Sequence, residues 1–396
     1  MPDGSVINSI AAGVNSGLTF GGTFGLLGVV ELAALVVIAP RLWRAARAGR
    51  RLTTAKHESI HNQLMNDGEP AALSDAPSDA PRLSIVIPAR NEATRLAECL
   101  APLRDASGIH EIIVVDDEST DTTSEVAHRF GARVIRGAPL PSGWVGKIWA
   151  IEQGIAAAQG DVVITLDADA RPAPELVESL AKSFTQSGAV FATVAPRFRT
   201  SSPSGQWLHA AMLTSLVYRH GAGAGRSTKD TVANGQCMIF RRTDAVDGKW
   251  CHEVQGSTIE DVALARWLVS RNQHVEMFDG GDVLTVQMYE GFTDTWRGWG
   301  RSLALTGVDS RQRQLSDAVV TLLTLVAPLW LLLFGIATPL TLLLLITRIG
   351  TLIGARRAYE RPSIGYWLSP IADVLVWVIV VRGIVAPTRQ WRGRQY

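Results

Sequence analysis

The stretch Val162-Val163-Ile164-Thr165-Leu166-Asp167-Ala168-Asp169 joins an apolar run to two aspartates. An earlier apolar run, Ile112 to Val115, is followed in the same way by Asp116 and Asp117. Short apolar runs of this kind are typical of buried strands in a parallel sheet. In an open α/β sheet, the carboxyl ends of the strands form the crevice in which ligands bind. We therefore expect two acidic pairs at neighbouring strand ends, where they can hold a divalent cation against a phosphorylated ligand.

The region around this stretch alternates apolar runs with helical patterns from residue 82 to about residue 195. Strands are expected at 83–87, 111–115, 133–135 and 162–166, with helices near 96–103, 121–130 and 147–158. Such βαβ repetition predicts a mostly parallel, doubly wound sheet. Beyond residue 200 the pattern predicts helices at 207–220 and 259–270 and an extended segment at 236–240.

Composition limits the class of protein. The chain has 396 residues, of which 47% are hydrophobic, so it can form one large or two ordinary domains, and the apolar excess lies at the two ends. The formal net charge of +1 gives no basic field, so nucleic acid is not expected as a partner. Cys99, Cys237 and Cys251 are odd in number and lack CxxC spacing, which predicts neither a disulfide framework nor a zinc site.

The N-terminal apolar run, Leu18 to Ile38, contains Glu31 as its only charged residue and is long enough to cross a hydrocarbon core of about 30 Å. We expect an uncleaved anchor, because no Lys or Arg precedes it as a signal peptide would require. Arginines follow it at positions 41, 44, 47, 50 and 51. By the positive-inside rule they place the next segment in the cytoplasm. Two interpretations of Glu31 remain open: it pairs with another helix, or it faces the interior of a helix bundle.

Three further apolar stretches follow, at 318–335, 339–353 and 366–385. Three crossings would leave the arginines near the C-terminus outside, so one stretch is re-entrant or two form a short hairpin, and the number of crossings stays open. The expected organisation is an anchor at 1–40, a basic juxtamembrane segment and flexible linker at 41–81, a cytoplasmic catalytic domain at 82–315 and a transmembrane region at 316–396.

Other polar groups are expected near the acidic pairs. Pro88-Ala89-Arg90-Asn91-Glu92 ends the first strand of the domain and directs polar groups to the same edge of the sheet. Gly143 to Lys147 supplies a turn and an ammonium ahead of a helix, which suits a phosphate. Helix capping is the alternative for Asp167 and Asp169, and also for Ser119 to Asp121.

Three of these motifs together resemble the family 2 glycosyltransferases, whose catalytic domain has the GT-A fold: Ile87 to Glu92, Val115 to Asp121, and Asp167 to Asp169. The stretch Gly143-Trp144-Val145-Gly146-Lys147-Ile148-Trp149-Ala150 is similar to membrane-bound members of hopanoid and carotenoid glycolipid pathways. The resemblance spans residues 82 to about 305. It implies hexosyl transfer from a nucleotide-sugar, most simply a UDP-sugar, with Mg²⁺ or Mn²⁺, to a lipid acceptor. It also implies an integral protein of the inner or plasma membrane with a cytoplasmic catalytic domain.

The resemblance further implies roles for individual residues. Asp116 and Asp117 would contact the nucleoside, and Asp169 with Asp167 would hold the metal. Glu260-Asp261 resembles the acceptor-side motif of the family, whose aspartate is the general base, so Asp261 is the expected catalytic residue. The other expected substrate-binding residues are Pro88, Ala89, Asn91, Glu92, Lys147, Asn234, Gly235 and Glu260.

Alternatives remain for the acceptor-side residues. Displacement at an anomeric carbon independently requires a base near the acceptor hydroxyl and neutralisation of the leaving diphosphate. Acidic residues are also common in the first turn of a helix, which is the alternative for Glu260 and Asp261. A plain turn is the alternative for Asn234 and Gly235.

The chain departs from the family pattern at Trp296-Arg297-Gly298-Trp299-Gly300-Arg301, where the family carries Gln/Arg-x-x-Arg-Trp. Arg297 and Arg301 are four residues apart, so they clamp a diphosphate together or lie at the membrane interface. The departure argues against a processive polysaccharide synthase. A catalytically silent membrane scaffold of the same fold is the other alternative.

Overall fold

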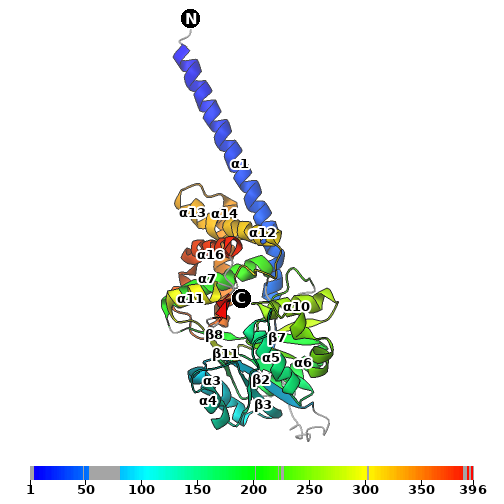
Figure 1. The fold of residues 1–396 in the computed structure, drawn as a ribbon. Coiled ribbons are helices and arrows are strands. Elements are labelled where there is room, and N and C mark those ends of the chain that lie inside the picture. Colours follow the sequence, from blue (N-terminus) through cyan, green and yellow to red (C-terminus); the bar gives the residue numbers. More distant parts are fainter. Residues whose placement is uncertain are drawn as a thin grey trace, which may run out of the picture.

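The acidic stretch at 162–169 lies near the centre of a large sheet. The structure is a computed structural model, and it describes residues 4–47, 49–52, 81–200, 202–221, 223, 227–300, 303–386, 390–391 and 394–395. Its sheet has eight strands, with helices packed around it (Figure 1). The strand order is β1 (Arg50–Arg51), β10 (Val275–Asp279), β7 (Phe191–Ala195), β9 (Cys237–Arg241), β5 (Val162–Leu166), β2 (Leu83–Ala89), β3 (Ile109–Asp116) and β4 (Arg133–Arg136).

The predicted parallel sheet is confirmed with one exception. Strand β9 runs antiparallel to both β5 and β7, whereas the other neighbouring strands are parallel. The antiparallel strand has a direct consequence for the site. Because β9 runs opposite to β5, the residues that precede β9 lie beside the residues that follow β5.

Helices cover both faces of the sheet, as expected for a doubly wound fold. Ile85 and Ile87 of β2 enter one core while Val86 enters the other, because side chains alternate along a strand. The first core is closed by α3 (Ala93–Leu100), α4 (Thr123–Arg129) and α6 (Leu176–Ser187). The second is closed by α5 (Gly146–Ala157), α8 (Arg242–Asp247), α9 (Trp250–Glu253) and α10 (Glu260–Ser270).

A smaller sheet adjoins the acidic stretch. It pairs β11 (Leu284–Gln287) with β6 (Ala170–Pro172) on one side and with β8 (Arg197–Arg199) on the other. Residues 167–169 form the short connection between β5 and β6, and Ala170 N donates to Asp167 O at 2.9 Å. The two aspartates therefore lie in a tight turn between two strands, and not at the start of a helix.

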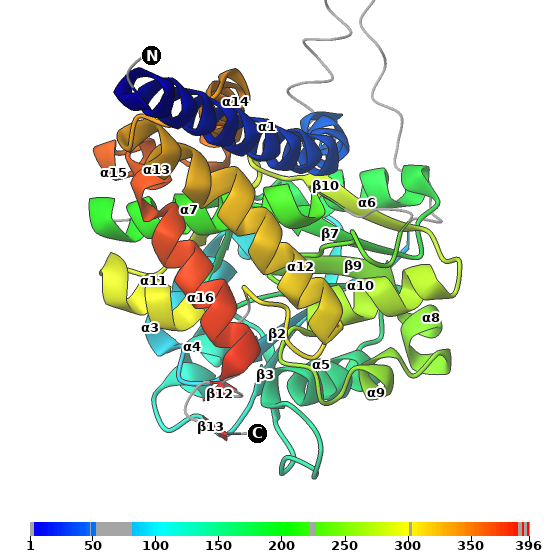
Figure 2. The same cartoon turned by 90° about the horizontal axis from the view of Figure 1, so that it is seen from above.

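A layer of helices covers the large domain on the side of the N-terminal helix. Seen from above, α7 (Pro203–His220), α12 (Arg311–Thr321) and α16 (Asp373–Val385) lie across the domain (Figure 2). They share an apolar core that includes Leu208, Ala318 and Val376. The remaining elements of this half are α11 (Gly291–Trp299), η2 (Leu322–Val326), α13 (Ala327–Leu333), α14 (Pro339–Ala355), η3 (Arg356–Ala358), α15 (Ile364–Trp367) and η4 (Ser369–Ala372).

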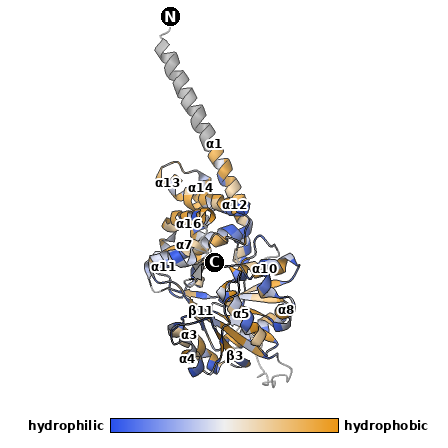
Figure 3. Ribbon diagram, viewed as in Figure 1, coloured by the Kyte–Doolittle hydropathy of each residue, from blue (hydrophilic) through white to orange (hydrophobic). Residues whose placement is uncertain are grey.

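Among the described residues, three helical segments are long and apolar enough to cross a membrane: Gly25–Arg47 within α1 (Gly4–Arg47), Arg311–Leu333 and Pro339–Ala358. Hydrophobic residues accumulate along them (Figure 3). The expected stretch at 366–385 instead breaks into α15, η4 and α16. Helix α16 has 13 residues, which is about 20 Å of helix and too short to cross about 30 Å.

Both interpretations of Glu31 agree with the structure: the residue bonds to another helix, and it is buried between helices. Its side chain is 3% exposed, and it accepts hydrogen bonds from the hydroxyl groups of Thr338 and Thr341. Thr338 is also the N-cap of α14, where it accepts from the backbone N–H of Thr341 at 3.2 Å. One carboxyl group thus joins α1 to the start of α14.

Candidate active site

The site forms where β5 ends and β9 begins. Asp167 N donates to Gln236 O at 3.0 Å, which continues the pairing of Leu166 with Cys237 beyond the strands. The turn at Asn234 and Gly235 is thereby brought beside the acidic turn. Asn234 supports it, because its side-chain oxygen accepts from Gln236 N at 2.9 Å. Two motifs 65 to 70 residues apart in the sequence thus become one structural unit.

Lys147 connects this unit to helix α10. Its ammonium nitrogen lies 2.8 Å from Asp167 Oδ1 and 2.9 Å from Glu260 Oε1, and it donates to Gly235 O at 3.5 Å. Lys147 lies in the first turn of α5, where the helix dipole disfavours a cation. Burial also tends to lower the pKa of this ammonium, but the carboxylates of Asp167 and Glu260 outweigh it and raise the pKa. Lys147 is therefore a permanent positive charge inside the acidic cluster.

Asp261 is oriented by the same turn. Its Oδ2 accepts a hydrogen bond from Gly235 N at 2.7 Å, and its Oδ1 accepts from Val262 N at 2.8 Å. A Cβ at position 235 would lie 3.2 Å from both Asp261 Oδ2 and Glu260 Oε1, so a side chain there would crowd the two carboxylates. Glycine therefore allows the backbone to approach the acidic pair closely.

Burial raises the pKa values of the central carboxyl groups. For Asp261, burial and the neighbouring Glu260 carboxylate raise the pKa to about 7, against the opposing effects of Lys147 and two backbone N–H donors. For Asp167, burial also raises the pKa, Lys147 opposes this, and Asp169 adds to it. Carboxyl groups with raised pKa values in a cavity are typical of sites that bind cations or transfer protons.

Most of the predicted residues meet in one cavity of about 860 Å³. The predicted residues that line it are Pro88, Glu92, Lys147, Asp167, Asp169, Asn234, Gly235, Glu260, Asp261 and Arg297. Arg301 lies outside the described part of the chain. The cavity is large enough for a ligand of nucleotide-sugar size.

Four predicted residues are not among the described residues that line the cavity: Ala89, Asn91, Asp116 and Asp117. Asp116 is buried and accepts hydrogen bonds from Ser119 N at 2.9 Å and from the Ser124 hydroxyl. Asn91 accepts from Thr120 N at 2.8 Å. In this structure these side chains organise the loops that follow β2 and β3, so a nucleoside contact remains a prediction for Asp116 and Asp117.

The acidic turn fits a divalent cation. Asp167 and Asp169 offer carboxylate oxygens, the ligands that Mg²⁺ and Mn²⁺ prefer. The Lys147 ammonium, 2.8 Å from Asp167, shows that this carboxylate already binds a positive charge in the folded protein. Helix capping, the alternative for these two residues, does not apply because β6 follows them directly. The donor set is therefore suitable for such an ion.

The sequence motifs did not predict the apolar wall of the cavity. It consists of Phe198, Leu216, Val232, Ile259, Val262, Met288, Trp299, Leu303 and Leu305, which come from α7 and from segments before and after it in the sequence. Ile259, Val262 and Leu305 also pack together as a small apolar cluster next to Asp261. No short motif connects these positions, because they converge only when the chain folds.

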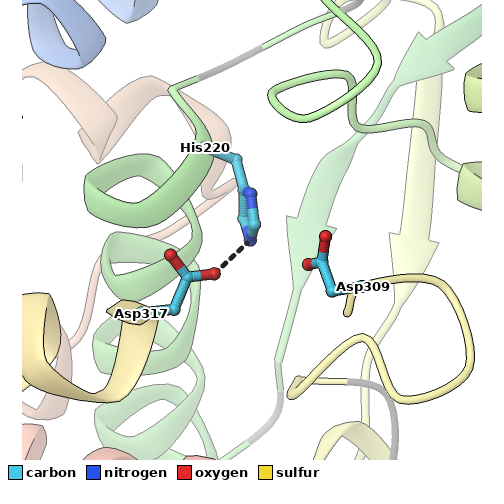
Figure 4. A group of neighbouring side chains, drawn as sticks. All are labelled: His220, Asp309 and Asp317. Atoms are coloured by element: carbon cyan, nitrogen blue, oxygen red, sulfur yellow. Dashed lines mark ion pairs between the residues drawn. The ribbon is translucent and has the colours of Figure 1, made fainter. Parts of the chain in front are cut away.

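A second group of possible metal ligands lies behind this wall. Ligand atoms of His220, Asp309 and Asp317 lie within 4.8 Å of one another (Figure 4). His220 Nε2 is 3.5 Å from Asp317 Oδ2, and burial together with nearby arginines lowers the pKa of His220 well below its usual value. Both aspartates already have arginine partners: Arg266 at 2.6 Å from Asp309, and Arg313 at 3.2 Å from Asp317. These cations make the group a poor site for a metal ion.

The arginines next to His220, Asp309 and Asp317 instead support the wall of the cavity. Arg219 donates to Leu303 O at 2.8 Å, and Arg266 donates to Thr231 O at 2.9 Å. Leu303 lines the cavity, and Thr231 directly precedes Val232, which also lines it. We call Arg219, His220, Arg266, Asp309, Arg313 and Asp317 the buried arginine cluster. It connects helices α7, α10 and α12 to the two loops that contribute Val232 and Leu303 to the apolar wall.

The fold and the site define a class of protein. A mostly parallel sheet with an acidic turn at the end of a strand fits the GT-A fold, and among the described residues helices long enough to span a membrane flank it. Residues 84–247 match the family described as "Glycosyl transferase family 2". The match covers 164 of the 396 residues, so over this part the chain is similar to the family 2 glycosyltransferases.

Two relatives and one solved structure illustrate the similarity. The chain is 27% identical to a 4,4'-diaponeurosporenoate glycosyltransferase of Staphylococcus haemolyticus over 247 residues, which is 60% of this chain and 65% of the relative. It is 27% identical to the Staphylococcus aureus enzyme of the same name over 245 residues, covering 60% and 64%. The chain thus spans slightly less than two thirds of these relatives.

Among solved structures, a mannosyltransferase from Pyrobaculum calidifontis in complex with GDP-Man and Mn²⁺ has a TM-score of 0.50 and 14% identity. That similarity covers 90% of this chain and 99% of the mannosyltransferase. It therefore extends beyond residues 84–247. At this identity it shows a shared fold.

Proposed function

We propose that the protein transfers one sugar from a nucleotide-sugar to a membrane lipid at the cytoplasmic face of the membrane, with inversion at the anomeric carbon. The observation that carries this proposal is the cavity that combines Asp167, Lys147 and Asp261 with an apolar wall next to the membrane helices. The donor is expected to be a UDP-sugar. The relatives named for diaponeurosporenoate support a lipid-like acceptor.

Each polar residue has a role in this proposal. Asp167 and Asp169 would hold a divalent cation, which supplies charge neutralisation for the leaving diphosphate when it is bound. Lys147 holds Asp167 and Glu260 together and keeps their charges compensated. Asp261, oriented by Gly235 N–H, accepts the proton of the acceptor hydroxyl. Arg297 extends from α11 into the same cavity and would bind the diphosphate.

The loops around the cavity account for the remaining predicted residues. Asp117 lies 3.6 Å from Arg90, and Arg90 lines the cavity. We propose that the nucleoside binds beside this pair, with Asp116 and Asp117 as its acceptors. Pro88 and Glu92 would form the adjoining edge of the donor site.

The test is release of nucleoside diphosphate from a panel of UDP- and GDP-sugars by the full chain in detergent. Each donor is combined with Mn²⁺ or Mg²⁺ and with host lipid extract, and the wild type is compared with Asp261→Asn. Lipid-dependent release by the wild type alone supports the proposal and identifies the donor. Absence of release from every donor, together with absence of metal-dependent nucleotide binding, favours the silent scaffold.

A further inference from the structure

The cavity carries a strong excess of negative charge. Among its described lining residues, seven carboxyl groups face four basic side chains. Three of the basic side chains already have carboxylate partners: Lys147 is bound to Asp167 and Glu260, Arg95 lies 3.5 Å from Glu92, and Arg90 lies 3.6 Å from Asp117, which is not among the lining residues. The charges of a divalent cation and a donor diphosphate largely compensate each other. The negative excess therefore remains after the donor has bound.

Two of these carboxyl groups lie where the acceptor must react. Asp261 and Glu260 are adjacent, and the Glu260 carboxylate contributes to the raised pKa of Asp261. A second anionic oxygen brought to Asp261 would meet the same repulsion in a partly buried setting. An uncharged hydroxyl would instead donate a hydrogen bond to the Asp261 carboxylate.

The surface beside Asp261 is apolar. Ile259 and Val262 flank the Glu260-Asp261 pair, and Leu305 packs against both. Leu305 is 4% exposed and has a φ of +48°, a conformation that disfavours a leucine and is tolerated by asparagine. Leu305 thus combines a strained backbone with an apolar side chain that lines the cavity. Strain of this kind is often found at functional sites.

We propose that the acceptor nucleophile is an uncharged hydroxyl group on an apolar body that lies against Ile259, Val262 and Leu305. This inference rests on the proposed glycosyl transfer and specifies its acceptor. It excludes phosphate and carboxylate nucleophiles, although the relatives are named for an acceptor whose name denotes a carboxylate. Those relatives are 27% identical to this chain, which leaves room for a different acceptor group.

The reaction balances with the nucleotide-sugar as co-reactant. The hydroxyl oxygen forms a bond to the anomeric carbon, and the bond from that carbon to the diphosphate oxygen breaks. The leaving nucleoside diphosphate takes the electron pair of that bond. The hydroxyl proton passes to the Asp261 carboxylate and then to solvent.

The experiment compares three acceptors with the same fifteen-carbon chain: farnesol, farnesoic acid and farnesyl phosphate. The full chain in detergent is given each acceptor with the donor that shows lipid-dependent release, and the glycosylated product is measured by mass spectrometry. We expect kcat/KM for farnesol to exceed the other two values by about 100-fold or more. Equal or faster transfer to the phosphate or the acid would overturn the inference.

Two further outcomes separate this inference from the proposed function. If the donor is used with host lipid extract but none of the three compounds is glycosylated, the inference fails while glycosyl transfer stands. If no donor is used even with the extract, the proposed function itself fails.

The apolar surface is tested with Leu305→Asn. Asparagine suits the left-handed backbone, which offsets part of the lost apolar packing, so the variant is expected to fold with a lower thermal midpoint than the wild type. We expect KM for farnesol to rise about 10-fold, with little change in KM for a short-chain alcohol. An unchanged KM for farnesol would show that the chain of the acceptor lies elsewhere.

Discussion

The side chain of Asp261 is held by two backbone N–H groups and crowded by Glu260. General bases typically contribute between 10²- and 10⁴-fold to a rate. We expect Asp261→Asn to lower kcat about 10³-fold, because asparagine has nearly the same shape but cannot accept the proton. Binding of nucleoside diphosphate, measured by calorimetry, should stay within about 3-fold of the wild type. A loss of nucleotide binding in the variant would assign Asp261 to the donor site instead.

The same carboxyl group predicts the pH dependence of the reaction. Burial and Glu260 raise the pKa of Asp261 to about 7, so the carboxyl is protonated below that pH and cannot act as a base. The turnover rate should therefore fall about tenfold per pH unit below pH 7 and level off above it. The residual rate of Asp261→Asn should lack this acidic limb. A wild-type rate that stays level down to pH 5 would contradict the assignment.

The residues that could be predicted are those that follow a strand or start a helix within a recognisable motif. Asp167, Lys147 and Asp261 belong to this group, and the structure brings all three into one cavity. No recognisable sequence motif marks His220, Asp309 and Asp317. They are separated by up to about a hundred residues and each is unremarkable in its own segment, so only the fold brings them together.

At the scale of elements, the turn before β9 controls the geometry of α10. In Gly235→Ala, the added Cβ would lie 3.2 Å from Asp261 and Glu260 and would push the turn away from α10. The shift needed is a few tenths of an ångström, and since a displacement of about 1 Å can lower a rate about 100-fold, we expect kcat/KM to fall about 10-fold. Gly350→Ala in α14 is the matched control, because a Cβ there has no neighbour within 4 Å. Equal activity of the two variants would show that the turn can relax.

The buried arginine cluster should matter for stability. Arg266→Met leaves the Asp309 carboxylate, with 6% of its side chain exposed, without its partner at 2.6 Å. Removing one member of a buried ion pair typically costs about 3–5 kcal/mol, so we expect a clear drop in the thermal midpoint. Arg271→Met, at the C-cap of the same helix, is the control. Arg271 is exposed and stacks on Trp267, and its loss should cost less than about 1 kcal/mol.

Periodicity predicted the strands β2, β3 and β5 because each contains a local apolar run that its neighbours bury, and it predicted the half-buried edge strand β4 from Val134 and Ile135. It did not predict β7 or β10, and these pair with each other across more than eighty residues of sequence. It also treated residues 366–385 as one apolar stretch. Ser369 and Pro370 fall within it, and the structure divides the stretch into α15, η4 and α16 at that point.

At the scale of the whole molecule, the proposed topology places the catalytic domain in the cytoplasm. All three native cysteines are buried, so they should give little background with a membrane-impermeant maleimide. A cysteine introduced at the exposed Asp105, at the end of η1 (Ala101–Asp105), should be labelled in lysed cells and not in intact cells. Labelling in intact cells would reverse the topology and place the donor site outside.

The ammonium of Lys147 between Asp167 and Glu260 means that the acidic cluster has a counter-ion of its own. Chelation by EDTA should therefore abolish activity without opening the site, and the thermal midpoint should change by no more than about 2 °C. In Lys147→Met, chelation would leave the carboxylates facing one another, and the midpoint should then fall well below that of the metal-loaded variant. A protein that tolerates chelation can be purified free of metal and divided into aliquots. Mg²⁺, Mn²⁺ and other ions can then be compared on a single preparation, with full recovery of activity as the internal standard.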